Sequence, residues 1–288
     1  ETVDDVDNLL DFDTLTFGET SGSATWTTFD PLDVSSDLNV DFGTLDRSSS
    51  TINVSGDLIT GVNGLWIGIS TTTFDGSTGA QWVDNSVSVQ DIGYVVIDGS
   101  AKAVSLQSDV KASSITVGAD DSLNAGGANT LFLSGNFTNN NTFSAQTGTI
   151  EIIGIGSNAI ISANGSSLYN LTASTTGGGT VAFVDPNITI LGDFTIATGT
   201  VTLPTATTSL SGSFSNTGGT FAHNNAEVRF IGSGSETIEL MGTEFFNHFY
   251  DVSFTGSGDW TFIDTNATTS NTLSISNGNV VLPSGQLS

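Results

Sequence analysis

The chain has 288 residues, no cysteine, and four Lys plus Arg against 30 Asp plus Glu, which gives a formal net charge of −26 at pH 7. These counts exclude disulfides and Cys-ligated metal centres, and so few cations exclude nucleic-acid binding and binding to an anionic membrane surface. Direct membrane insertion is not expected either, because no apolar run reaches about 18 residues.

Residues 1–20 form an acidic segment that alternates with apolar residues such as Leu10 and Phe12. We predict a strand here that adds to the sheet of a neighbouring molecule. Calcium is the one cofactor the sequence suggests, and a solvated acidic face is the competing interpretation. The weak candidate ligands in this segment are Asp4, Asp5, Asp7, Asp11 and Asp13.

Residues 21–90 hold three of the four tryptophans, and they do not match the repeat found further along the chain. We predict a separate Trp-containing β domain or a cap for the repeats. Trp66, within an apolar run, is expected in the core. Trp26 and Trp82 have polar neighbours, so they are the candidates for stacking on sugar rings.

Residues 91–132 are interpreted as a partial repeat, and 133–209 and 210–288 as two full repeats. Matching segments return at offsets of about 77 to 81 residues in the same order, which requires an explanation other than chance. The matching pairs are 133–137 and 210–214, 142–143 and 220–221, 154–157 and 232–235, 168–171 and 249–252, 183–185 and 262–264, and 199–204 and 278–283.

Short alternating runs bounded by Gly, Asn, Asp and Thr indicate many short strands with one buried face. A repeat of about 79 residues divides into about three coils of roughly 25 residues, each with two or three strands. The predicted fold is therefore all-β, a right-handed parallel β-helix or β-solenoid with an N-terminal β cap or small β domain. Tandem β-sandwich domains are the alternative.

Residues 136–143, which read NFTNNNTF, are followed by Thr-Gly-Thr-Ile at 147–150. This pattern resembles the repeats of bacterial and archaeal extracellular surface proteins, similar to adhesins and autotransporter passengers. The resemblance covers about residues 91–288. It implies an extracellular β-solenoid without catalytic residues.

Residues suited to catalysis are scarce. His223 and His248 are the only histidines, and no nucleophile motif accompanies them. Asp185 and Asp264 occupy one position in successive repeats, which is typical of turn formers. We therefore expect no enzyme. Seven glycosylation sequons occur, about the number that chance gives, at Asn53, Asn136, Asn140, Asn164, Asn170, Asn187 and Asn266.

The sequence thus predicts a structural subunit of an extracellular filament, stalk or surface layer, with further copies of itself as the partner in a head-to-tail homopolymer. Residues 280–288 show no polar cap, so we expect the array to continue or its end to be covered by another molecule. The alternative is a cell-surface adhesin whose N-terminal region binds glycans. We expect export, with a signal peptide absent from this chain.

Overall fold

The protein is described from a computed structural model that covers residues 2–3, 10–18, 24–241 and 247–286. Over these residues the structure contains strands and no helix, and the strands pair in parallel as a β-solenoid of about 12 turns. The chain divides into two compact units, Glu1–Gly148 (unit 1) and Thr149–Ser288 (unit 2). The structure confirms the predicted β-solenoid, and the alternative of tandem β-sandwich domains is wrong.

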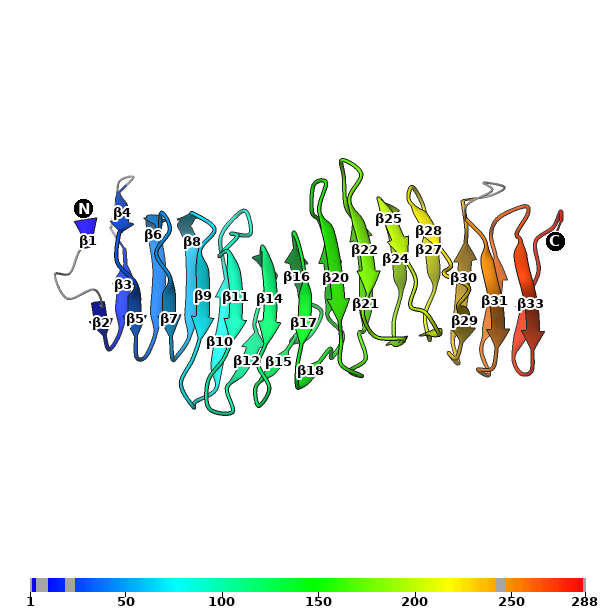
Figure 1. The fold of residues 1–288 in the computed structure, drawn as a ribbon, viewed down its shortest axis with the longest axis horizontal. Helices are drawn as coiled ribbons and strands as arrows, with labels where there is room; N and C mark the ends of the chain where they lie inside the picture. The colour runs from blue at the N-terminus through cyan, green and yellow to red at the C-terminus, as the bar shows by residue number, and fades with distance from the viewer. Residues whose placement is uncertain (1, 4–9, 19–23, 242–246, 287–288) are drawn as a thin grey trace. The chain divides into compact units, whose positions relative to one another are not determined.

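Unit 1 is built from stacked rows of parallel strands (Figure 1). The first row is β1 (Thr2–Val3), β4 (Thr25–Thr28), β6 (Leu38–Asp46), β8 (Leu58–Ile67), β10 (Ala80–Asp84), β12 (Ala103–Leu106), β15 (Ser122–Asn124) and β18 (Thr142–Ser144), with β3 (Leu15–Phe17) also paired to β6. The second row is β2 (Leu10–Phe12), β5 (Leu32–Val34), β7 (Ile52–Val54), β9 (Thr71–Phe74), β11 (Tyr94–Ile97), β14 (Ser114–Val117) and β17 (Phe137–Asn139). A third row starts later, with β13 (Val110–Ala112) and β16 (Thr130–Leu133).

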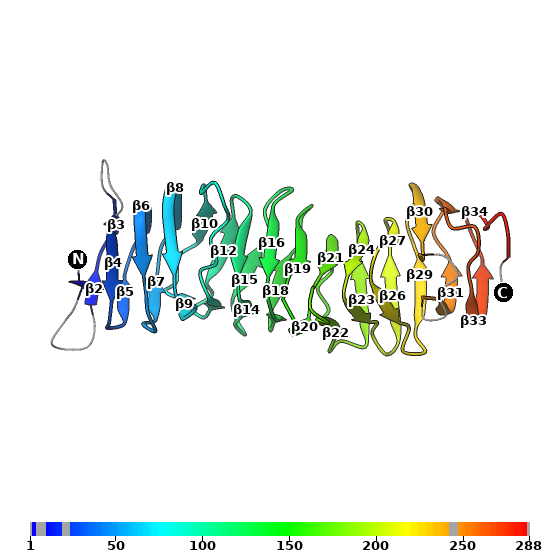
Figure 2. The same ribbon diagram turned by 90° about the horizontal axis from the view of Figure 1, so that it is seen from above.

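Unit 2 has three rows (Figures 1 and 2). One is β19 (Thr149–Ile152), β21 (Asn170–Ser174), β24 (Phe194–Thr198), β27 (Phe214–Asn216), β30 (Ser235–Glu239), β32 (Asp259–Phe262) and β34 (Asn279–Val281). The next is β20 (Asn158–Ser162), β22 (Thr180–Phe183), β25 (Thr200–Thr202) and β28 (Thr220–Ala222). The last is β23 (Asn187–Ile190), β26 (Thr207–Leu210), β29 (Glu227–Phe230), β31 (Phe249–Phe254) and β33 (Thr269–Ile275).

The interior of each unit is a set of ladders in which one inward side chain stacks on the next. In unit 1 one ladder runs through Leu32, Ile52, Thr72, Val95 and Ile115, all buried and in register. Successive members are 20 to 23 residues apart, slightly fewer than the roughly 25 predicted per coil. Because side chains of a strand alternate between its faces, the immediate strand neighbours of these residues point outward.

The region 21–90 consists of turns of this solenoid and not of a separate domain. Its strand β9 pairs with β11, and β10 pairs with β12, so the ladder crosses the predicted boundary at residue 90. Near the N-terminus, β2 pairs with β5 and β3 with β6 of the same chain. Strands 10–12 and 15–17 therefore form part of the chain's own first turns, whereas residues 4–9 lie outside the described part.

The sequence repeat does not equal a whole number of turns. Leu171 and its repeat mate Val252 are both buried, but they lie on β21 and β31, which belong to different rows of unit 2. Phe183 on β22 and Phe262 on β32 are likewise in different rows. The repeat therefore preserves which residues point inward while placing them on another face of the solenoid.

In the described part of the chain, no helix is long and apolar enough to span a membrane.

Candidate functional site

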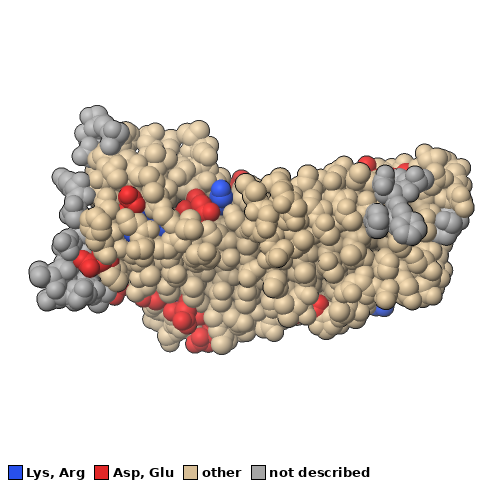
Figure 3. Space-filling view, turned by 45° about the horizontal axis from the view of Figure 1, so that its top comes forward, with Lys and Arg blue, Asp and Glu red and all other residues tan. Residues whose placement is uncertain are grey.

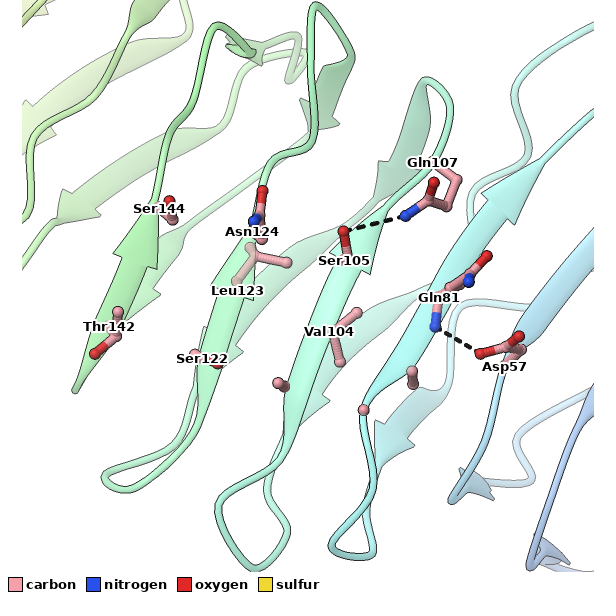
Figure 4. A pocket seen from close by; sticks show the side chains of 13 residues that line it. Asp57, Gln81, Val104, Ser105, Gln107, Ser122, Leu123, Asn124, Thr142 and Ser144 are labelled. Carbon is pink, nitrogen blue, oxygen red and sulfur yellow. Dashed lines mark hydrogen bonds between the residues drawn. The ribbon is translucent and has the colours of Figure 1, made fainter.

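A hollow of about 480 Å³ lies on the outer face of unit 1, across β10, β12, β15 and β18 (Figure 4). We call it the polar hollow. It is lined by Asp57, Gly79, Ala80, Gln81, Ala103, Val104, Ser105, Gln107, Ser122, Leu123, Asn124, Thr142 and Ser144.

Strand register arranges the outward side chains of the hollow in two rows. Gln81, Ser105, Asn124 and Ser144 form the first, since each is the pairing partner of the next. Ala103, Ser122 and Thr142 form the second. Neighbouring strands lie about 4.8 Å apart, so four rungs extend over about 14 Å. Figure 4 shows the first row crossing the four strands.

The hollow exists because the outward side chains of β12, β15 and β18 are small while the inward ones are firmly packed. Val104, Leu123 and Phe143 alternate with them and are buried in the core. Strand β12 pairs with β10 and β15, and β15 pairs with β12 and β18. The backbone groups of β12 and β15 are therefore engaged in the sheet on both sides. A ligand in the middle of the hollow therefore meets side chains rather than free backbone groups.

Several polar atoms of the hollow have bonding capacity left. Gln107 Nε2 donates to Ser105 Oγ (3.1 Å), Gln146 Nε2 donates to Ser144 Oγ (2.9 Å), and Asn124 Oδ1 accepts from Gly126 N (2.8 Å). A hydroxyl that accepts one bond can still donate its own proton, and an amide has two N–H donors. The Asn124 Nδ2 group and the hydroxyls of Ser105 and Ser144 therefore retain donors for a ligand in the hollow.

Asp57 is the only ionisable residue lining the polar hollow, and its Oδ1 accepts a hydrogen bond from Gln81 N (2.7 Å). The nearby Lys102 is fully buried and donates from Nζ to Ser55 O, so it presents no charge at the surface. Burial lowers the pKa of Lys102, and the charges of Asp75, Asp57 and Asp121 oppose that shift. The hollow is thus nearly uncharged, with one carboxylate at its edge.

Arg47 is the second buried cation of unit 1. Nη1 donates to Thr72 Oγ1 (2.8 Å) and to Ile92 O (2.7 Å), and Nη2 donates to Gly68 O. The guanidinium also lies over the Trp66 ring, 5.2 Å from its centroid. Burial lowers the pKa of Arg47 to about 10, opposed by the charge of Asp91, so the group stays charged at neutral pH. Its contacts make it a structural residue.

The two tryptophans predicted to stack on sugars are in the core instead, which corrects that prediction. Trp82 is 1% exposed and packs against Phe74, and Trp26 is 8% exposed and packs against Phe17. Neither ring face is available to a sugar at the surface. Trp66 is buried, as predicted, and Trp260 is buried as well.

The acidic segment yields no assigned calcium site. Asp4, Asp5 and Asp7 lie outside the described residues, as does the Asp11 side chain, and Asp13 is exposed. Among the residues that are described, no three His, Cys, Asp or Glu side chains gather in a way that could hold a metal ion.

The structure brings the two histidines together. The rings of His223 and His248 lie 4.8 Å apart, and Tyr250 stacks on His223 at 5.4 Å. His223 Nδ1 accepts a hydrogen bond from Asn225 N (3.0 Å). Burial and the neighbouring His248 lower the pKa of His223. The hydrogen bond to Nδ1 fixes the turn at residues 224–225.

Asp185 and Asp264 serve the backbone of the preceding turn. Asp185 accepts from Ala163 N (2.6 Å) and Asn164 N (3.1 Å), and Asp264 accepts from Leu240 N (2.5 Å). These contacts are those of turn formers, as the repeat register predicted.

The seven sequon asparagines are exposed or half-exposed, and none is buried. Two of them use the amide nitrogen that a glycan would modify. Asn140 Nδ2 donates to Val117 O (2.9 Å), and Asn170 Nδ2 donates to Thr149 Oγ1 (3.3 Å).

Sequence reasoning missed the polar hollow, although the sequence holds one signal for it. Three strands that are neighbours in the first row, 103–106, 122–124 and 142–144, carry only small outward residues. Figure 3 shows a face on which most atoms belong to neither acidic nor basic residues, and acidic atoms form small separate groups.

Comparison of the chain with protein-family models, curated proteins and solved structures gives no match.

Proposed function

We propose that the chain is a structural segment of an extracellular filament, stalk or surface layer. The observation that supports this most is the construction of each unit from stacked parallel turns around dry ladders of Leu, Ile, Val and Phe. Each turn contacts only its neighbours, so such a stack extends by adding turns of the same kind. A chain rich in Ser and Thr and poor in Lys and Arg suits the solvent-exposed setting outside a cell.

The joints between such segments are proposed to be solenoid ends. Ile275 on β33 is in register with the buried Phe254 but is 47% exposed, and among the described strands β33 is paired on one side only. A further turn stacked on β33, from the same polypeptide or from another copy, would bury this side chain and pair the free edge. Strands 10–12 and 15–17 are less suited as donated strands, because they already pair within the chain.

Electron microscopy of the purified protein at several concentrations, with and without calcium, tests self-assembly. We expect regular fibres whose axial repeat matches one subunit. Ile275→Lys should prevent them by placing a charge on the free edge, whereas Ile67→Lys, at a residue 54% exposed on β8, should not. Dispersed single particles under every condition would contradict a homopolymer.

A further inference from the structure

We propose that the polar hollow of unit 1 is a binding site for a neutral polysaccharide. Its two rows of side chains, Gln81, Ser105, Asn124 and Ser144 beside Ala103, Ser122 and Thr142, offer hydroxyl and amide groups without clustered charge. Hydroxyls and amides both donate and accept, which is the pattern that matches sugar hydroxyl groups.

The shape of the hollow favours an extended chain of sugars over a single one. The rungs repeat at the spacing of the strands, so equivalent groups recur along about 14 Å of the solenoid. A volume of about 480 Å³ accommodates several sugar rings lying along the rows. Each rung contributes one or two hydrogen bonds, and affinity accumulates along the polymer.

The chemistry of the hollow disfavours other classes of ligand. An acidic polymer would meet Asp57 and a chain of net charge −26, with no exposed cation among the lining residues. An extended peptide binds through the free edge of a sheet, but β12 and β15 are paired on both sides. An apolar ligand would leave the amide and hydroxyl groups of the hollow without partners.

Two substitutions test the site without disturbing the core. Asn124→Asp retains Oδ1, which accepts from Gly126 N, and replaces only the Nδ2 donor by a charged acceptor. Ser122→Trp fills the hollow from an outward position. Asn187→Asp and Ser209→Trp make the same changes on unit 2, at exposed and half-exposed positions outside the hollow.

The full chain is titrated with cellohexaose, mannohexaose and maltohexaose, and with a galacturonate hexamer as the acidic comparison, by calorimetry and by amide chemical shifts. We expect at least one neutral hexamer to bind weakly, with a Kd of about 1 mM, and to shift amides between residues 79 and 146. Asn124→Asp should weaken binding by about three- to tenfold, and Ser122→Trp should abolish it. The two unit 2 variants should bind like the original chain.

Failure of all three neutral hexamers to bind would overturn the proposal. So would undiminished binding by the Ser122→Trp chain, or equal binding of the galacturonate hexamer. Microscopy of the same variants is a separate readout: Ser122→Trp should still form fibres, so loss of glycan binding and loss of assembly are distinguishable.

Discussion

The two units fill their interiors in different ways. Unit 1 stacks mainly aliphatic ladders and encloses two cations, Arg47 and Lys102. Unit 2 contains one basic residue, Arg229, whose side chain is 44% exposed and paired with Glu227. Besides aliphatic residues, its interior holds one connected cluster of aromatic rings, which includes Phe194, Phe214, Phe221, Phe249, Phe230, Phe254 and Trp260.

The difference follows from how many rows close each turn. The N-terminal turns of unit 1 have two rows of strands, and Arg47 and Lys102 donate to carbonyl groups of residues outside the strands, at Gly68, Ile92 and Ser55. Buried carbonyls without partners are costly, so a buried donor stabilises such a turn. Turns with three rows engage more of their backbone in the sheets, and the described part of unit 2 buries polar residues such as Asn216 and Asn247 but no Lys or Arg.

Phe214→Ala should have the largest effect, since this ring lies at the centre of the unit 2 aromatic cluster. It contacts Phe194 (5.5 Å), Phe221 (5.3 Å) and Phe249 (5.5 Å) and is fully buried. We expect a loss of about 3–5 kcal/mol in the free energy of unfolding, because truncation removes contacts and leaves a cavity. Amide hydrogen exchange should show the loss mainly in unit 2.

Phe29→Ala is the matched control for this prediction, because Phe29 is 62% exposed. Its free energy of unfolding should change by less than about 0.5 kcal/mol. Equal losses from both variants would show that the aromatic cluster does not carry the stability of unit 2.

Arg47→Met should have the next largest effect and act on unit 1. The substitution keeps an unbranched side chain but removes the donors to Thr72 Oγ1, Ile92 O and Gly68 O, so we expect a loss of about 2–4 kcal/mol. Urea unfolding measures it. Lys111→Met, at a half-exposed cation of the same unit, should change stability by less than about 0.5 kcal/mol.

A second substitution sharpens the role of Arg47. Thr72 Oγ1 also donates to Ile92 O (2.9 Å), so Thr72→Val in the Arg47→Met background removes the remaining side-chain donor to this carbonyl and should lower stability further. Unchanged stability of the single Arg47→Met variant would show that the carbonyls do not need the guanidinium.

Much of the fold can be predicted from local alternation, because a strand residue two positions from a buried one is also buried. The same rule explains the error over Trp82: its neighbours Gln81 and Val83 point outward, so their chemistry says nothing about the environment of the ring. Trp26 between Thr25 and Thr27 is the same case.

The features that could not be predicted depend on contacts between turns. The polar hollow needs the register of four strands that are far apart in the sequence, and the burial of Arg47 depends on acceptors contributed by the two following turns. A single sequence shows the periodicity of each strand but not which outward residues become neighbours.

The smallest expected effect distinguishes the units by their response to acid. Both histidines belong to unit 2, and burial together with His248 lowers the pKa of His223 in the folded chain. The unfolded chain, with a histidine pKa of about 6.5, therefore takes up a proton first as the pH falls. Stability from this residue is complete above about pH 6.5 and declines as the pH falls towards the folded pKa. Thermal unfolding at about pH 8 and about pH 5 measures the decline, which should be smaller in His223→Gln.

His248→Gln removes the neighbouring charge and should also reduce the decline, because less then opposes protonation of His223. Hydrogen exchange should place the acid-sensitive opening near Asn225, whose N–H loses its acceptor when Nδ1 is protonated. An identical pH dependence in the original chain and in His223→Gln would show that the contact between the rings has no energetic consequence, and acid sensitivity would then arise from carboxylates in either unit.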